Sequence, residues 1–187
     1  MSKKPYIYDA IFIDRDGTLN PDPGYISSLK DFQLYSFTLD ALKKLSTLSP
    51  HLCIITNQSG ISRGLIEKNE LDKIHSYLIG KIEQEQMAIS GLYVCTDLPG
   101  TGSKRRKPQT GMFLEAEKDL SIELNQCLMV GDSLSDIEVG NSLNMDTMLV
   151  LTGRGQETLK EISKKFTVSF TAKNLYEGAE MLLSSKN

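Results

Sequence analysis

Two aspartates stand two residues apart directly after a short apolar run, residues 11–13. If the extended backbone of that run continues, the side chains of Asp14 and Asp16 point to the same side. Neighbouring carboxylates do not ionise with equal ease, so one can attack while the other carries a proton. Asp14 could form an acyl-phosphate, and Asp16 could protonate the leaving oxygen and then activate water. A simple turn at Gly17 would explain this motif equally well.

A second pair of acids makes the turn explanation weaker. Asp132 and Asp136 stand four residues apart after the apolar run 128–130, and we expect Asp136 on the first turn of a helix. Carboxylates that gather with phosphate oxygens and water are the usual ligands of Mg²⁺. One of the two acids could simply cap the helix. Helix capping does not account for four acids that meet at one edge.

Groups that could bind a phosphate follow two further segments. Thr56 and Asn57 end the apolar run 52–55, where hydroxyl, amide and backbone N–H groups can bind phosphate oxygens, although ordinary helix entries have the same composition. Lys107 is the best-placed cation for a phosphoryl group in transfer. It ends the basic run 104–107, which could also be a solvated loop. We rank a nucleic-acid interface there last.

Other routes of phosphoryl transfer lack their residues in this chain. None of the three cysteines is followed by an arginine at the spacing Cys-x₅-Arg, and no Gly-x₄-Gly-Lys-Ser/Thr occurs. His51 and His75 lie outside every polar cluster. These absences argue against cysteine, P-loop and histidine chemistry.

Apolar runs rich in Ile, Val, Phe and Tyr alternate with stretches of helical periodicity. This alternation predicts a doubly wound, mostly parallel α/β sheet of the Rossmann-like kind, with helices on both faces. Such sheets bind ligands at the carboxyl ends of their strands, where the polar clusters of this chain stand. The predicted strands are 11–13, 52–55, 92–94, 128–130 and 148–151, and helical stripes lie in 39–48, 71–82 and 113–120.

Composition is that of an ordinary globular protein, with 187 residues, 40% of them hydrophobic, and a net charge of −3. This length predicts one domain over 1–187, and this charge gives no general attraction to nucleic acid or membrane. Residues 1–5 lack the pattern of a secretory signal, and cysteines within apolar runs favour reduced thiols. We therefore expect a cytoplasmic monomer or weak homo-oligomer whose partner is a small phosphorylated metabolite.

Four segments together resemble the motifs of the haloacid dehalogenase superfamily. They occur in the order of that family, and with their flanks they span roughly residues 9–140. The resemblance implies the haloacid dehalogenase fold with a minimal cap. The segments are 14–20 (DRDGTLN), 56–60 (TNQSG), 106–108 (RKP) and 131–136 (GDSLSD).

The resemblance also implies phosphatase chemistry through an aspartyl-phosphate. Asp14 would be the nucleophile and Asp16 the general acid and base. Thr56 and Lys107 would bind the phosphate. A Mg²⁺ ion would be bound by Asp14, the main-chain carbonyl of Asp16, Asp132 and Asp136, the last directly or through water.

Within the superfamily, the residues of these motifs resemble those of the branch that contains heptose bisphosphate and histidinol-phosphate phosphatases. The expected reaction is removal of the 7-phosphate of D-glycero-D-manno-heptose 1,7-bisphosphate, because Arg106 offers a second cation for the other phosphate. Histidinol phosphate is the nearest alternative substrate. A catalytically silent phosphate-binding module is a third alternative, and the intact set of acids argues against it.

One segment departs from this branch. Many relatives carry a zinc loop of Cys-x-His followed by Cys-x-Cys before the Arg-Lys-Pro motif. Here Cys95 remains, Asp97 replaces the histidine, and Ser103 and Arg105 replace the cysteine pair. One thiol and one carboxylate fall short of the four ligands of a structural zinc. We therefore expect Mg²⁺ as cofactor and no zinc.

The metal content tests this expectation. EDTA should abolish phosphatase activity and added Mg²⁺ should restore it, because the predicted ligands are the carboxylates that Mg²⁺ prefers. Elemental analysis of the untreated protein should find no stoichiometric zinc. A tightly held zinc ion in each chain would show that Cys95 and Asp97 have further ligands.

Overall fold

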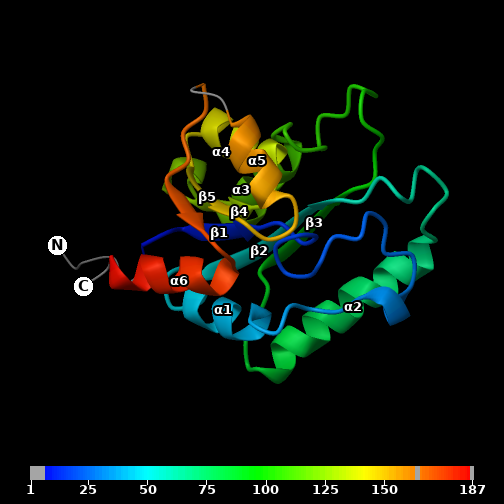
Figure 1. The fold of residues 1–187 in the computed structure, drawn as a ribbon, viewed down its shortest axis with the longest axis horizontal. Coiled ribbons are helices and arrows are strands. Elements are labelled where there is room, and N and C mark those ends of the chain that lie inside the picture. The colour runs from blue at the N-terminus through cyan, green and yellow to red at the C-terminus, as the bar shows by residue number, and fades with distance from the viewer. Residues whose placement is uncertain (1–6, 163–164, 186–187) are drawn as a thin grey trace.

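Six parallel strands form one sheet in the order β3-β2-β1-β4-β5-β6, and helices cover both of its faces (Figure 1). The computed structural model describes residues 7–162 and 165–185. The segment 1–5, on which the expectation about secretion rests, lies outside them. The predicted doubly wound α/β fold is confirmed.

All five predicted strands are present, with bounds that differ by no more than two residues from the predicted ones. The edge strand β6 was not predicted, because its sequence FTA is too short to show a periodic pattern. The strands are β1 Ala10–Ile13, β2 His51–Asn57, β3 Gly91–Cys95, β4 Leu128–Gly131, β5 Asp146–Val150 and β6 Phe170–Ala172.

The predicted helical stripes lie in the first three helices. Only Leu48 falls outside, because α1 ends three residues earlier, although its side chain is buried. Two short 3₁₀ turns, η1 Leu29–Asp31 and η2 Leu124–Gln126, interrupt the loops. The helices are α1 Thr38–Leu45, α2 Lys68–Gln84, α3 Gly111–Leu120, α4 Leu134–Ser142, α5 Gly155–Glu161 and α6 Leu175–Ser184.

The central strand β1 shows how the two helical layers are attached. Its side chains are all buried and alternate between the faces of the sheet. Ile11 and Ile13 pack in the core that contains apolar residues of α1, α2 and α6. Phe12 packs in the core that contains apolar residues of α3 and α4, with the ring of Phe113 5.0 Å away. A strand that is buried on both faces explains the uninterrupted apolar run in the sequence.

Strand order brings the polar motifs together. Strand β1 lies between β2 and β4, so the chain changes direction across the sheet at β1. Ligands of open parallel sheets bind at such a switch point, outside the carboxyl ends of the strands. The three strands therefore deliver three of the four motifs to one edge, and the loop after β3 delivers the fourth.

None of the helices in the described residues is long and apolar enough to cross a lipid bilayer. Cys53 and Cys127 are free and buried, as expected, and so is Cys95. The segment that follows β1 is a loop that contains η1. The segment that follows β3 is also a loop.

Helix α2 buries a histidine against the loop that follows β1. His75 is only 7% exposed, and its Nε2 atom lies 3.0 Å from Nη1 of Arg15, which is itself 1% exposed. Burial, and then the charge of Arg15, lower the pKa of His75 from 6.5 to about 4. The histidine is therefore neutral in the folded protein and accepts a hydrogen bond from the arginine.

This buried histidine should make stability depend on pH. Below pH 6.5 the unfolded chain binds a proton at His75, and the folded chain does not until about pH 4, so stability is lost as pH falls through this window. His75→Gln keeps an acceptor for Arg15 but does not titrate. Between pH 6.5 and 4.5 its unfolding free energy should fall by about 2 kcal/mol less than that of the wild type.

Urea unfolding of both proteins at the two pH values, with EDTA present to remove metal, measures this difference. Equal losses in the two proteins would show that His75 does not titrate between the folded and unfolded states.

Candidate active site

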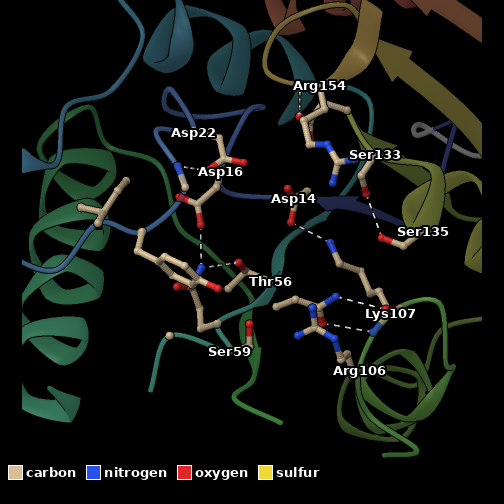
Figure 2. Close-up of a pocket in the computed structure, with 17 residues that line it drawn as sticks. Asp14, Asp16, Asp22, Thr56, Ser59, Arg106, Lys107, Ser133, Ser135 and Arg154 are labelled. Atoms are coloured by element: carbon tan, nitrogen blue, oxygen red, sulfur yellow. Dashed lines mark hydrogen bonds and ion pairs between the residues drawn. The ribbon is translucent and has the colours of Figure 1, made fainter. Parts of the chain in front are cut away.

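A cavity of about 340 Å³ opens at the carboxyl ends of β1, β2 and β4 (Figure 2). The structure brings seven of the eight predicted site residues to its wall. The eighth, Asp136, is fully buried and does not line the cavity. The seven are Asp14, Asp16, Thr56, Asn57, Arg106, Lys107 and Asp132.

Three acids form a buried cluster. Carboxylate oxygens of Asp14, Asp132 and Asp136 all lie within 4.8 Å of one another. Burial raises the pKa of Asp14, against the opposing effect of Lys107, and Asp136 and Asp132 raise it further. Burial, followed by the charge of Asp136, raises the pKa of Asp132 to about 7. The cluster therefore requires cations beside it in order to stay ionised.

Lys107 supplies one of these cations. Its Nζ atom lies 2.6 Å from Oδ1 of Asp14 and 2.7 Å from Oδ1 of Asp136, and it donates to the carbonyl of Ile55 at 2.9 Å. Burial alone would lower the pKa of this lysine, but Asp136 and Asp14 raise it well above its usual value. The ammonium group thus stays charged in a buried position.

Asp16 lies apart from the cluster of three acids. Its carboxylate accepts hydrogen bonds from Asn20 at 2.8 Å, from Gln58 at 2.7 Å and from the guanidinium of Arg15 at 2.7–3.0 Å. The side chain is 21% exposed and faces the cavity (Figure 2). Asp14, Asp132 and Asp136 thus lie close together. Asp16 lies at the cavity wall and is paired with Arg15.

Two residues of the second motif meet the cavity in different ways. Thr56 is buried, and its hydroxyl accepts a hydrogen bond from Gln58, which leaves its own proton available to a ligand. The side-chain amide of Asn57 bonds the main chain of Lys107 in both directions, at 3.1 Å each. Asn57 therefore holds the third motif against the second, in addition to its predicted contact with phosphate.

The loop that follows β1 approaches the carboxylate of Asp132 closely at Gly17. This residue has a φ of +85°, and a Cβ atom there would overlap the carboxylate of Asp132. Glycine is needed for both reasons. The turn expected at Gly17 is present, and the sequence did not indicate its contact with Asp132.

Hydrogen bonds hold the loop between β3 and the Arg-Lys-Pro motif. The carboxylate of Asp97 accepts from the hydroxyl of Ser103 and from the thiol of Cys95. The Ser103 oxygen in turn accepts from the backbone N–H groups of Arg105 and Arg106, at 3.2 and 3.1 Å. These hydrogen bonds connect Asp97 to both ends of the loop, and the expectation that no zinc binds here stays a prediction.

Sequence reasoning missed several residues at the site. Arg15 and Gln58 lie inside recognised motifs but gave no sign that they bind Asp16. Asp22 and Arg154 line the cavity from loops that carry no motif. The turn after the fifth predicted strand, Thr152-Gly153-Arg154, was a usable signal, because ligands bind where parallel strands end.

The donor chemistry of the three-acid cluster fits a divalent cation. All of its ligand atoms are carboxylate oxygens, the type that Mg²⁺ prefers. Among the described residues, the buried Oδ1 atom of Asp136 has the Lys107 ammonium, 2.7 Å away, as its one partner, and no other donor bonds it. A cation at the cluster would offset the mutual repulsion of the acids.

Comparison with known proteins agrees with this geometry. The family model of haloacid dehalogenase (HAD)-like hydrolases matches residues 104–178. The D-glycero-beta-D-manno-heptose-1,7-bisphosphate 7-phosphatase of Photorhabdus laumondii is 31% identical over 171 residues, which are 87% of this chain and 91% of that protein. The enzyme of the same name from Haemophilus ducreyi is 37% identical over 78% of this chain and 84% of its own length.

A solved structure of a protein with a similar name has the same fold. The D,D-heptose 1,7-bisphosphate phosphatase from B. bronchiseptica, complexed with magnesium and phosphate, superimposes with a TM-score of 0.86 at 28% identity and covers 95% of this chain and 99% of its own. Identity above 30% over most of both chains, together with the shared fold, shows the family. The protein is a phosphatase that belongs to the HAD-like family of the heptose bisphosphate phosphatases.

Proposed function

We propose that this protein removes the 7-phosphate of D-glycero-D-manno-heptose 1,7-bisphosphate through an aspartyl-phosphate, with Mg²⁺ as cofactor. The observation that carries the chemistry is the position of Asp14, which lies at the wall of the cavity, is paired with the Lys107 ammonium and is close to Asp132 and Asp136. The relatives named above carry the choice of substrate.

Asp14 acts as the nucleophile. One of its oxygens is bound to Lys107 at 2.6 Å, which orients the carboxylate and opposes the rise in its pKa that burial causes. A carboxylate oxygen attacks the phosphorus atom, the bond to the sugar oxygen breaks, and an acyl-phosphate forms on Asp14. Lys107 and the hydroxyl of Thr56 bind oxygens of the phosphoryl group.

Asp16 transfers the protons. Its side chain lies outside the three-acid cluster and faces the cavity, so it can reach the leaving oxygen. It gives a proton to that oxygen and then takes one from the water that hydrolyses the acyl-phosphate. Hydrogen bonds from Asn20 and Gln58 orient the carboxylate for both steps.

Asp14, the main-chain carbonyl of Asp16 and Asp132 would hold the Mg²⁺ ion, with Asp136 as a direct or water-mediated ligand. When bound, the ion supplies positive charge that neutralises phosphate oxygens. Asp136 also orients the lysine through its ion pair of 2.7 Å, and it caps α4 through Ser133.

Arg106 favours a bisphosphate over histidinol phosphate as substrate. It lines the cavity beside Lys107, and its Nη1 atom donates to the carbonyl of Asp97, which leaves further N–H groups for a ligand. The single phosphate of histidinol phosphate has no use for this second cation. A silent binding module is disfavoured, because a protein that only binds phosphate has no need of the acids that repel one another here.

The roles of the two acids can be tested separately. Asp14→Asn should abolish turnover, because an amide does not form an acyl-phosphate, and Asp16→Asn should slow it by about 10²- to 10⁴-fold. Asp22→Asn is a matched control, since this acid also lines the cavity and bonds only the backbone of its own loop. Its loss should be far smaller. Near-normal phosphate release by the Asp14 variant in Mg²⁺ would refute the mechanism.

The substrate assignment is tested at the two neighbouring cations. Arg106→Ala should lower kcat/KM on the bisphosphate by about 30- to 150-fold, because a charge-assisted contact worth about 2–3 kcal/mol is lost, and much less on p-nitrophenyl phosphate. Lys107→Ala should impair both substrates, because it removes a contact to the transferring group. Equal losses for Arg106→Ala on both substrates, or a preference of the wild type for histidinol phosphate, would contradict the bisphosphate assignment.

A further inference from the structure

Among the described residues, one cation at the cavity wall makes no hydrogen bond or ion pair through its side chain, although its charge acts on Asp22. Lys107 is engaged with two carboxylates, and Arg106 donates to the carbonyl of Asp97. The third cation at the wall is Arg154, whose side chain is exposed. Throughout residues 7–162 and 165–185, no side chain or carbonyl forms a hydrogen bond or ion pair with its guanidinium. An unpaired guanidinium in a cavity that accepts phosphate esters is available to an anion.

The backbone of Arg154 is fixed against the catalytic loops. Its N–H donates to Oδ2 of Asp132 at 2.7 Å, and the hydroxyl of Thr152 donates to the carbonyl of Gly17 at 2.6 Å. Gly153 has a φ of +54°, and a Cβ atom there would overlap Asp132 and Gly17. The turn between β5 and α5 therefore holds the arginine at a set distance from the reacting groups.

Figure 2 shows the direction of the side chain. Arg154 enters the cavity from the α5 side and extends towards Ser133, whereas Arg106 enters from the side of Lys107, with Asp14 between the two arginines in this view. The two cations thus come from different loops and face the same space.

A bisphosphate needs such an arrangement. Each phosphate monoester carries a charge of about −1.5 to −2 near neutral pH. Lys107 and a Mg²⁺ ion held by the acids would serve the phosphate that is transferred. Arg106 alone balances about half of the charge on the other phosphate, while Asp14, Asp16, Asp22 and Asp132 repel it from the wall. A second guanidinium would complete the balance, and each can bind phosphate through two N–H groups.

We propose that Arg154 is a substrate-binding residue that contacts the phosphate that is not transferred, opposite Arg106. This inference rests on the proposed function, because it requires a substrate with two phosphates. It assigns a specificity role to the turn between β5 and α5.

Kinetics of Arg154→Ala on the heptose bisphosphate and on p-nitrophenyl phosphate test the inference. The ratio of the two kcat/KM values should fall about 30- to 150-fold, mainly through KM for the bisphosphate. Arg154→Lys should recover part of the loss, because it restores the charge but not the bidentate contact. The matched control is Lys160→Ala. It removes an exposed charge from α5, the helix that follows Arg154, and should leave the ratio unchanged.

A double-mutant cycle with Arg106→Ala asks whether the two arginines bind one group. If both contact the same phosphate, the losses should not add in the double variant. Additive losses, an unchanged ratio in Arg154→Ala, or equal losses on both substrates would overturn the inference. Thermal melting of each variant checks that the fold is retained.

These results also separate the inference from the proposed function. If the wild type prefers the bisphosphate and Arg106→Ala removes that preference while Arg154→Ala does not, only the role of Arg154 fails. If the wild type shows no preference for the bisphosphate, the proposed function fails.

Discussion

The buried ammonium of Lys107 is the interaction on which the rest of the site depends. It joins Asp14 at the end of β1 to Asp136 on the first turn of α4, and it reaches the main chain of β2 at Ile55. Three elements that are distant in sequence are thereby held by one cation. Breaking a buried ion pair by removing one partner typically costs about 3–5 kcal/mol, because the remaining charge has no counter-charge. The same contacts that fold the loops also oppose the rise in the pKa of Asp14 and Asp132 that burial causes.

A second constraint is the close contact between loops around Asp132. Gly17 and Gly153 both lie against its carboxylate, and neither has room for a Cβ atom. The carboxylate also accepts the N–H of Arg154, so the loops after β1, β4 and β5 converge on one side chain. Side chains that leave these loops are therefore held in place by backbone contacts, which is the preorganisation that a phosphoryl-transfer site requires.

The loop before the Arg-Lys-Pro motif shows a different solution to the same problem. A network of hydrogen bonds centred on Asp97 and Ser103 holds this loop. Two backbone N–H groups of the loop end on the hydroxyl of Ser103, and the guanidinium of Arg105 pairs with Glu115 of α3. The network sets the position of Arg106, the residue to which we assign recognition of the second phosphate.

The α/β fold, five of the six strands and the motifs at their ends could be predicted from the sequence alone. Buried strands and helical stripes leave periodic patterns in the sequence, and these depend only on neighbouring residues. It also indicated which acids and which lysine gather, since the carboxyl ends of parallel strands share one edge. Other features became visible only in the folded protein. Asp16 lies apart from the other three acids, and the amide of Asn57 bonds the main chain of Lys107. His75 is neutral behind Arg15, and Arg154 lines the cavity. Each of these depends on how loops from different strands pack, and no local periodicity records the packing of loops.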